Sequence, residues 1–249
     1  MKLVASCVLA FGALGCMSSG AVGKTPEGAE IAVLPLRWSN VYVVKSRAPI
    51  LIDAGTLGDM DDLERGLRDE GVFLRDVRLV VVTHAHADHA GLAADLQRFV
   101  HARVMLGEGD LELARRGHDD FLRPTGFVAS ALKPFIPEIY PSFEPDDLVR
   151  EPTSLAPWGI DGQVLPMPGH TAGSIVVLLG NHTAFVGDEM LGGAFGAIFP
   201  HSPREHYYQA DPAKNRANIQ KLLAMGVETF YLGHGGPVAR KDVIEAFGF

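Results

Sequence analysis

The most informative stretch of the sequence is Thr83-His84-Ala85-His86-Ala87-Asp88-His89-Ala90-Gly91, which directly follows the apolar run Leu79-Val80-Val81-Val82. A β-branched run of this kind predicts a buried strand, and α/β proteins carry their chemistry at the carboxyl ends of such strands. While the chain stays extended, side chains two residues apart share a face, so His84 and His86 are expected on one side. Asp88 and His89 then follow as the chain turns into a helix over Leu92–Phe99. One corner of the fold is therefore expected to serve two metal ions.

The competing explanation is that these histidines simply collect in an exposed loop, as single histidines often do. The chain has only 10 histidines. Three of them and one aspartate fall within six residues behind a predicted buried strand, and we therefore favour a metal site.

This stretch resembles the H-x-H-x-D-H signature of the metallo-β-lactamase superfamily. Three later stretches resemble further motifs of that family in the family's order: Pro168-Gly169-His170-Thr171-Ala172-Gly173-Ser174, Phe185-Val186-Gly187-Asp188 and Tyr231-Leu232-Gly233-His234-Gly235. Upstream, Asn40–Val43 and Ile50–Gly55 resemble the family's opening strands. The resemblance covers the chain from about Ile31 to the C-terminus and leaves residues 118–150 and 189–210 unexplained.

Strands and helices are predicted in two similar groups, one before residues 118–150 and one after. This order suits two sheets packed face to face with helices outside. No linker, charge run or short repeat divides the 249 residues, so we expect one α/β domain over residues 31–249. The resemblance implies the four-layer αβ/βα sandwich of the family.

The N-terminus has a charged start, Met1-Lys2, and an apolar core of about 12 residues, which is too short to span a bilayer. We predict a secretory signal peptide over residues 1–15; the alternative is a hydrophobic helix packed on the domain. Ala13-Leu14-Gly15-Cys16 resembles a bacterial lipoprotein cleavage box, although Ala13 stands where that pattern prefers Leu. Lipidation of Cys16 would leave residues 16–30 as a flexible tether. The protein is then expected to be exported and lipid-anchored on the periplasmic side of a bacterial membrane, or otherwise periplasmic or secreted.

Composition narrows the chemistry and the partners. The formal charge of −8 argues against nucleic acid as a partner. Cleavage of the signal would remove Cys7 and leave Cys16 as the only cysteine, which excludes an internal disulfide and leaves His and carboxylate to do the chemistry. We expect a small-molecule substrate and membrane contact only through the N-terminal anchor; nothing in the sequence indicates an oligomeric state.

The resemblance implies a ligand set for two metal ions. It assigns His84, His86 and His170 to the first ion, Asp88, His89 and His234 to the second, and Asp188 as the bridge. Nitrogen and oxygen donors without a thiolate suit two zinc ions, and iron or manganese would accept the same set. On their own, His170 and His234 would be explained equally well as residues of glycine-containing turns.

Several other polar residues are assigned to supporting roles. Asp53 ends a predicted strand and is expected to cap a turn or orient a neighbouring ligand. His182 is expected in the bend of a hairpin. His206, Tyr207 and Tyr208 are candidate oxyanion or leaving-group donors, but ordinary packing or surface exposure is the favoured interpretation. The aromatic, Pro-broken segment 118–150 is expected to form a lid, a cleft wall or an interface.

The resemblance implies hydrolysis by a hydroxide that bridges two metal ions, with Asp88 essential to catalysis. An acidic bridging residue such as Asp188 is typical of thioesterases of the hydroxyacylglutathione hydrolase type, lactonases and phosphodiesterases, and is generally missing from β-lactamases. We therefore predict a dinuclear zinc hydrolase for a small ester, thioester or lactone.

Three alternatives remain open at this point. They are an iron-dependent enzyme like the persulfide dioxygenases, a β-lactam or phosphodiester hydrolase, and a non-catalytic surface module that holds metals for structure. His86 counts against redox chemistry, because the family's oxygen reductases usually have Glu there. The family's nucleases carry a long extra domain for which this chain has no room.

Overall fold

The computed structural model describes residues 19–119 and 123–249. The predicted signal peptide and Cys16 lie outside the described residues. Within those residues, no helix combines the length and the apolar character needed to cross a bilayer.

A seven-stranded sheet forms one half of the fold, with its strands in sequence order from β1 to β7. The strands are β1 (Gly20–Lys24), β2 (Glu30–Pro35), β3 (Asn40–Val44), β4 (Ile50–Ile52), β5 (Leu79–Val82), β6 (Arg103–Gly107) and β7 (Asp147–Val149). Strands β1 to β4 are antiparallel neighbours, whereas β4 to β7 run parallel. The parallel strands therefore deliver their carboxyl ends, including the residues after Val82, to one edge of the sheet.

A six-stranded sheet in the order β15-β14-β11-β10-β9-β8 forms the other half. Its strands are β8 (Thr153–Ser154), β9 (Gly162–Pro166), β10 (Ile175–Leu179), β11 (Thr183–Phe185), β14 (Thr229–Tyr231) and β15 (Val238–Ala239). His182 lies in the bend between β10 and β11 with a φ of 62°, as predicted. Strands β11 and β14 are parallel with Phe185 beside Tyr231, so the segments that follow them lie side by side.

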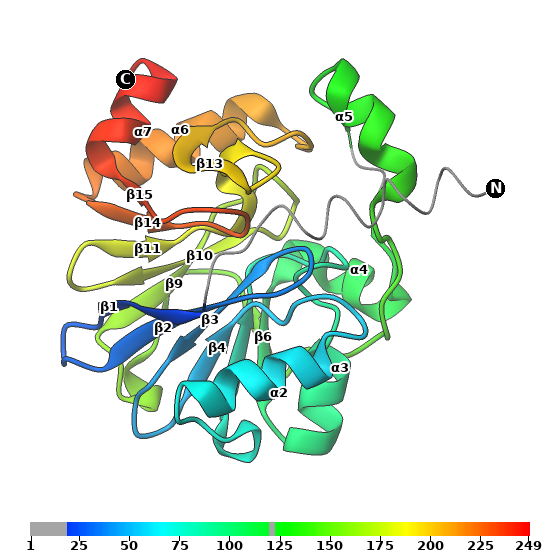
Figure 1. Cartoon of the computed structure of the whole chain (residues 1–249), viewed down its shortest axis with the longest axis vertical. Coiled ribbons are helices and arrows are strands. Elements are labelled where there is room, and N and C mark those ends of the chain that lie inside the picture. The colour runs from blue at the N-terminus through cyan, green and yellow to red at the C-terminus, as the bar shows by residue number, and fades with distance from the viewer. Residues whose placement is uncertain (1–18, 120–122) are drawn as a thin grey trace.

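Helices cover the outer face of each sheet (Figure 1). On the first sheet they are α2 (Met60–Asp69), α3 (Ala93–Asp95), which continues as a π-helical turn over Leu96–Val100, and α4 (Leu111–Arg116). On the second sheet they are α6 (Pro212–Ala224) and α7 (Arg240–Phe247). Helix α5 (Phe127–Leu132) lies away from both sheets. The predicted four-layer αβ/βα sandwich is confirmed.

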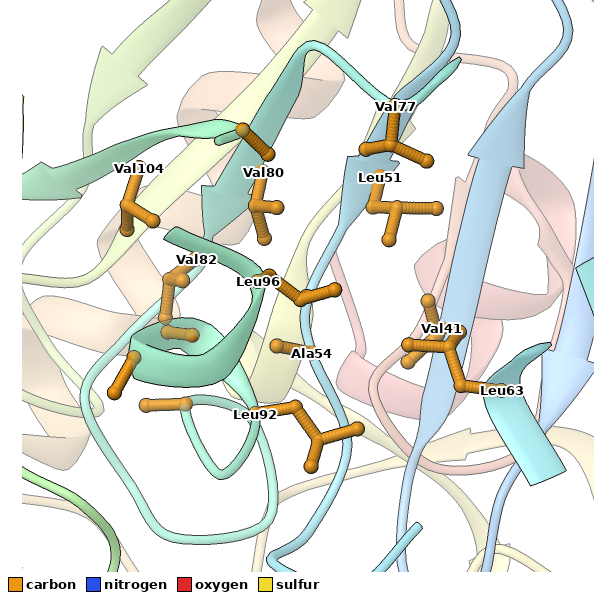
Figure 2. Close-up of a cluster of buried hydrophobic side chains, with 14 of the residues drawn as sticks. Val41, Leu51, Ala54, Leu63, Val77, Val80, Val82, Leu92, Leu96 and Val104 are labelled. Atoms are coloured by element: carbon orange, nitrogen blue, oxygen red, sulfur yellow. The ribbon is translucent and has the colours of Figure 1, made fainter. Parts of the chain in front are cut away.

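Alternation along β5 explains why its whole sequence is apolar. Val80 and Val82 pack toward the helices, together with Leu92 and Leu96 (Figure 2). Leu79 and Val81 belong to the core between the two sheets. A strand that is buried on both faces needs apolar side chains at every position. The segment that carries the histidines thus begins from a rigid, central strand.

The flexible tether predicted for residues 16–30 is wrong over Gly20–Lys24, which form the edge strand β1. This strand pairs with β2, and the hydroxyl of Tyr231 donates to Val22 O at 2.8 Å. The Ser- and Gly-rich composition suggested a tether, but backbone pairing with an open sheet edge does not depend on side-chain composition. The sequence analysis also did not predict the hairpin formed by β12 (Leu191–Ala194) and β13 (Ile198–Arg204).

The core between the sheets is centred on aromatic rings, and we expect Phe185→Ala to destabilise the protein. The ring of Phe185 lies 5.2 Å from that of Tyr42 and 4.9 Å from that of Tyr231. Its removal leaves a cavity, so the free energy of unfolding in urea should fall by about 3–5 kcal/mol. Phe73→Ala is the control, because that ring is 51% exposed and its loss should change stability by less than about 0.5 kcal/mol. Equal losses for the two variants would contradict this packing.

Candidate metal centre

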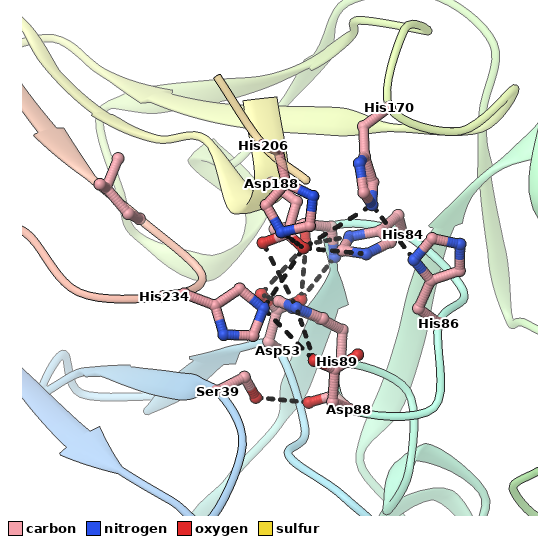
Figure 3. A network of polar contacts seen from close by, with 12 residues as sticks. Ser39, Asp53, His84, His86, Asp88, His89, His170, Asp188, His206 and His234 are labelled. Carbon is pink, nitrogen blue, oxygen red and sulfur yellow. Dashed lines mark hydrogen bonds and ion pairs between the residues drawn. The ribbon is translucent and has the colours of Figure 1, made fainter. Parts of the chain in front are cut away.

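The seven residues assigned as ligands from the sequence lie together at the edge where the two sheets meet (Figure 3). They all follow the ends of strands. His84, His86, Asp88 and His89 come after β5, and His170 lies in the turn between β9 and β10. Asp188 follows β11 and His234 follows β14. The parallel pairing of β11 with β14 brings these last two side chains side by side.

The ligand atoms fall into the two groups that the resemblance implied. His84, His86 and His170 offer atoms that all lie within 4.8 Å of one another, and so do Asp88, His89 and His234. Each group takes two residues from the first sheet and one from the second. Asp188 forms a further group with His84 and His89, and thus has a member of each group as a neighbour.

The distances around Asp188 show how centrally it lies. Its Oδ2 is 3.3 Å from Nε2 of His234, 3.7 Å from Nε2 of His170 and 3.9 Å from Nε2 of His84. Its Oδ1 is 3.5 Å from Nε2 of His89. A single buried carboxylate is therefore within reach of imidazoles from both groups.

The donor set fits divalent metal ions. Nε2 of His84, Nε2 of His89 and Oδ1 of Asp188 are buried and have no hydrogen-bond partner among the described residues. Such atoms are costly unless they are satisfied, and all three point into the cluster. Metal ions held in the two groups would satisfy these atoms, and imidazole with carboxylate is a donor set that zinc accepts.

Burial keeps the first group neutral and ready to bind a metal. It lowers the pKa of His84 and His170 well below the ordinary value and that of His86 to about 4. These imidazoles carry no second proton near neutral pH, so each keeps a lone pair for a cation.

Negative charge dominates the second group. Burial acts to lower the pKa of His89, but Asp188, Asp53 and Asp88 outweigh it and raise that pKa well above its usual range. For His234 the same opposition, led by Asp188, raises the pKa to about 10. A pocket that stabilises protons on these imidazoles in this way also favours a metal cation in place of the protons.

Asp53 orients a ligand, as predicted. Its Oδ2 lies 2.9 Å from Nδ1 of His89, and its Oδ1 accepts hydrogen bonds from Thr83 N at 2.7 Å and Thr83 Oγ1 at 2.9 Å. The bond to Nδ1 directs Nε2 of His89 toward the cluster. Backbone carbonyls do the same elsewhere, with Trp38 O 2.7 Å from Nδ1 of His234. Such outer contacts fix the direction of the metal-binding nitrogen.

Asp110 is a supporting residue that the sequence analysis missed. It is fully buried and accepts hydrogen bonds from Ala85 N at 2.9 Å, Thr171 Oγ1 at 2.7 Å and Gly173 N at 2.7 Å. It thereby ties the loop of His84 and His86 to the loop of His170. A carboxylate just beyond β6, beside β5, was the signal that could have identified it.

Gly233 shows how closely the last motif packs on the others. A Cβ atom at this position would lie 2.3 Å from Oδ1 of Asp188 and 2.6 Å from Cε1 of His89. The residue before His234 therefore has to lack a side chain.

Ordinary packing, the interpretation favoured from the sequence for these two residues, is wrong for His206 and right for Tyr208. Nε2 of His206 lies 3.1 Å from Oδ2 of Asp188, inside the cluster. The hydroxyl of Tyr208 instead donates to Ala129 O in α5. Segment 118–150 also reaches the ligand loop, because the hydroxyl of Tyr140 donates to Ala85 O at 2.8 Å.

A buried His and Asp cluster at the strand ends of an αβ/βα sandwich defines a metal-dependent hydrolase. Residues 35–234 match the family model of the metallo-β-lactamase superfamily, and the chain belongs to that superfamily.

Individual relatives agree with this assignment. A probable metallo-hydrolase of Methanocaldococcus jannaschii is 26% identical over 199 residues, covering 79% of this chain and 87% of the relative. A hydroxyacylglutathione hydrolase of Alkalilimnicola ehrlichii is 27% identical over 209 residues, covering 82% of this chain and 65% of the relative. The crystal structure of a metallo-β-lactamase family protein from Thermus thermophilus superposes with a TM-score of 0.62 at 25% identity, covering 88% of this chain and 77% of that one.

We expect Asp110→Asn to weaken metal binding although Asp110 touches no metal. One of its two acceptor oxygens becomes an amide donor that faces other donors, so the loops of His86 and His170 lose their common anchor. Zinc affinity, measured by competition with a chelating dye, should fall about 10- to 100-fold. Asp69→Asn changes an exposed carboxylate on α2 in the same way and should leave the affinity unchanged. Native affinity in Asp110→Asn would show that this carboxylate does not support the site.

Proposed function

We propose that this protein is a dinuclear zinc hydrolase for a small ester, thioester or lactone. The observation that carries the proposal is the position of Asp188, an acidic side chain within reach of both ligand groups. Two zinc ions, when bound, supply Lewis acidity and lower the pKa of a shared water toward neutrality. The similarity to a hydroxyacylglutathione hydrolase supports a thioester among the substrates.

The residues of the chain have distinct parts in this function. Asp188 lies between the groups and would fix the positions of the two ions relative to each other. Asp88, with Oδ2 3.3 Å from Nε2 of His234 and 3.7 Å from Nε2 of His89, completes the second group. The buried imidazoles and their outer contacts keep the centre rigid, so that little reorganisation accompanies the reaction.

The β12–β13 hairpin lies beside this centre, and we infer that its tip forms an apolar wall for the substrate. A Cβ atom on Gly196 would lie 2.9 Å from Cβ of His234, so the tip of the hairpin lies against a ligand. The neighbouring Phe195 is 38% exposed, has a φ of 58° and places its ring 5.5 Å from that of Tyr207. A bulky side chain in this strained conformation often marks a functional position. We assign Phe195 to contact with an apolar part of the substrate.

Asp88→Ala should reduce metal content and abolish hydrolysis. The second group loses its only carboxylate, so about one zinc ion per chain should remain instead of about two. Metal analysis should be combined with a panel of esters, thioesters, lactones, β-lactams and phosphodiesters, on which kcat should fall by about 10³-fold or more. Asp61→Ala, on the exposed face of α2, is the matched control.

The same panel separates the alternatives. Full activity in metal-free Asp88→Ala would refute the proposed mechanism. One iron per chain together with oxygen consumption, measured with an electrode, would indicate sulfur oxidation and not hydrolysis. Turnover of none of the substrates would indicate a module that only holds metal.

Phe195→Ala should change substrate preference and leave the chemistry intact. Loss of the ring removes apolar contact area from the substrate, so KM for esters with a large apolar acyl group should rise about tenfold, as expected for about 1.4 kcal/mol of lost contact. The kcat for a small acetyl ester should stay within about twofold. Phe73→Ala removes an exposed ring elsewhere and should alter neither constant. Equal effects of Phe195→Ala on large and small esters would contradict a role in specificity.

A further inference from the structure

His206 lies inside the metal centre although none of the family motifs includes it. It belongs to the segment between β13 and α6 and is only 7% exposed. Four imidazoles approach Oδ2 of Asp188 through Nε2, and His206 is the closest of them at 3.1 Å. It comes from the substrate-side segment that carries Tyr207.

One backbone carbonyl holds two of these imidazoles. Tyr208 O lies 2.9 Å from Nδ1 of His170 and 3.0 Å from Nδ1 of His206. A carbonyl oxygen has two lone pairs and can accept from both rings. The amide of Tyr208 also donates to Nδ1 of His206, at 3.3 Å. These contacts hold Nδ1 of His206 against the backbone of Tyr208 and leave Nε2 facing the cluster.

Nε2 of His206 faces a carboxylate oxygen of Asp188 at 3.1 Å. His170, Asp188 and His206 offer ligand atoms that all lie within 4.8 Å of one another. A metal ion close to Asp188 would lie within reach of all three side chains, and imidazole with carboxylate is a donor set that such an ion accepts.

We propose that His206 is an additional metal ligand, which binds through Nε2 to the ion shared by His170 and Asp188. This inference rests on the proposed function only in that the centre holds metal. It connects the metal to the segment that carries the substrate wall, because Tyr207 follows His206 and contacts Phe195. Metal occupancy would then order that wall as well as supply the chemistry.

The test is proton NMR of the cobalt(II)-loaded protein. A histidine bound to cobalt through one ring nitrogen shows a strongly shifted, exchangeable N–H signal from the other. The native protein should show one such signal more than its motif histidines supply. His206→Ala should lose that one signal, and its cobalt affinity should fall about tenfold. His182→Asn, in the exposed hairpin bend, should keep all signals and the affinity.

His206→Gln is the second variant, since its amide reaches the position of Nε2 and can still donate to Asp188 but supplies no imidazole nitrogen. Loss of the same signal in this variant supports ligation even if His206→Ala fails to fold. Retention of every shifted signal and of native affinity in a folded variant would overturn the proposal and leave His206 as a hydrogen-bond donor to Asp188. A native protein that binds no cobalt would instead refute the dinuclear centre itself.

Discussion

The carboxylate of Asp188 is the constraint on which the site depends. It is buried between the two ligand groups, and burial alone would raise its pKa. The imidazoles of His234, His206 and His89 hold that pKa well below its ordinary value, so the group keeps its negative charge. An ionised carboxylate costs several kcal/mol to bury unless positive charge surrounds it. The fold meets this requirement by directing the ends of strands from both sheets toward a single oxygen pair.

Two further buried carboxylates hold the loops that carry these imidazoles in position. Asp53 lies behind His89 and holds the start of the β5 loop through Thr83. Asp110 joins the loops that carry His86 and His170. Each accepts hydrogen bonds from the chain and has no ligand role in the proposed centre. Asp53 and Asp110 thus fix the centre from outside, because they accept hydrogen bonds from backbone amides as well as from side chains.

The sequence predicted those parts of the structure that local spacing determines. The strand β5 and the ligands after it follow from a β-branched run and from side chains at intervals of two, and the motif resemblance supplied His170, Asp188 and His234. Contacts over long separations were not accessible in this way. Asp110 binds partners 25, 61 and 63 residues away, and His206 meets Asp188 only after the β12–β13 hairpin has folded back. Strand β1 was missed because backbone pairing, and not composition, determines its conformation.

The division of ligands between the sheets gives the metal a second consequence. In each group two ligands come from the first sheet and one from the second, so an ion bound there is a non-covalent cross-link between the halves of the domain. The sequence has 2 cysteines, and in the proposed centre metal coordination would supply the kind of cross-link that a disulfide supplies in other domains. Binding to the folded chain alone adds about 2.7 kcal/mol to the free energy of unfolding when free metal exceeds its Kd about 100-fold. The cohesion of the two halves would thus depend on the metal supply around the protein as well as on its own packing.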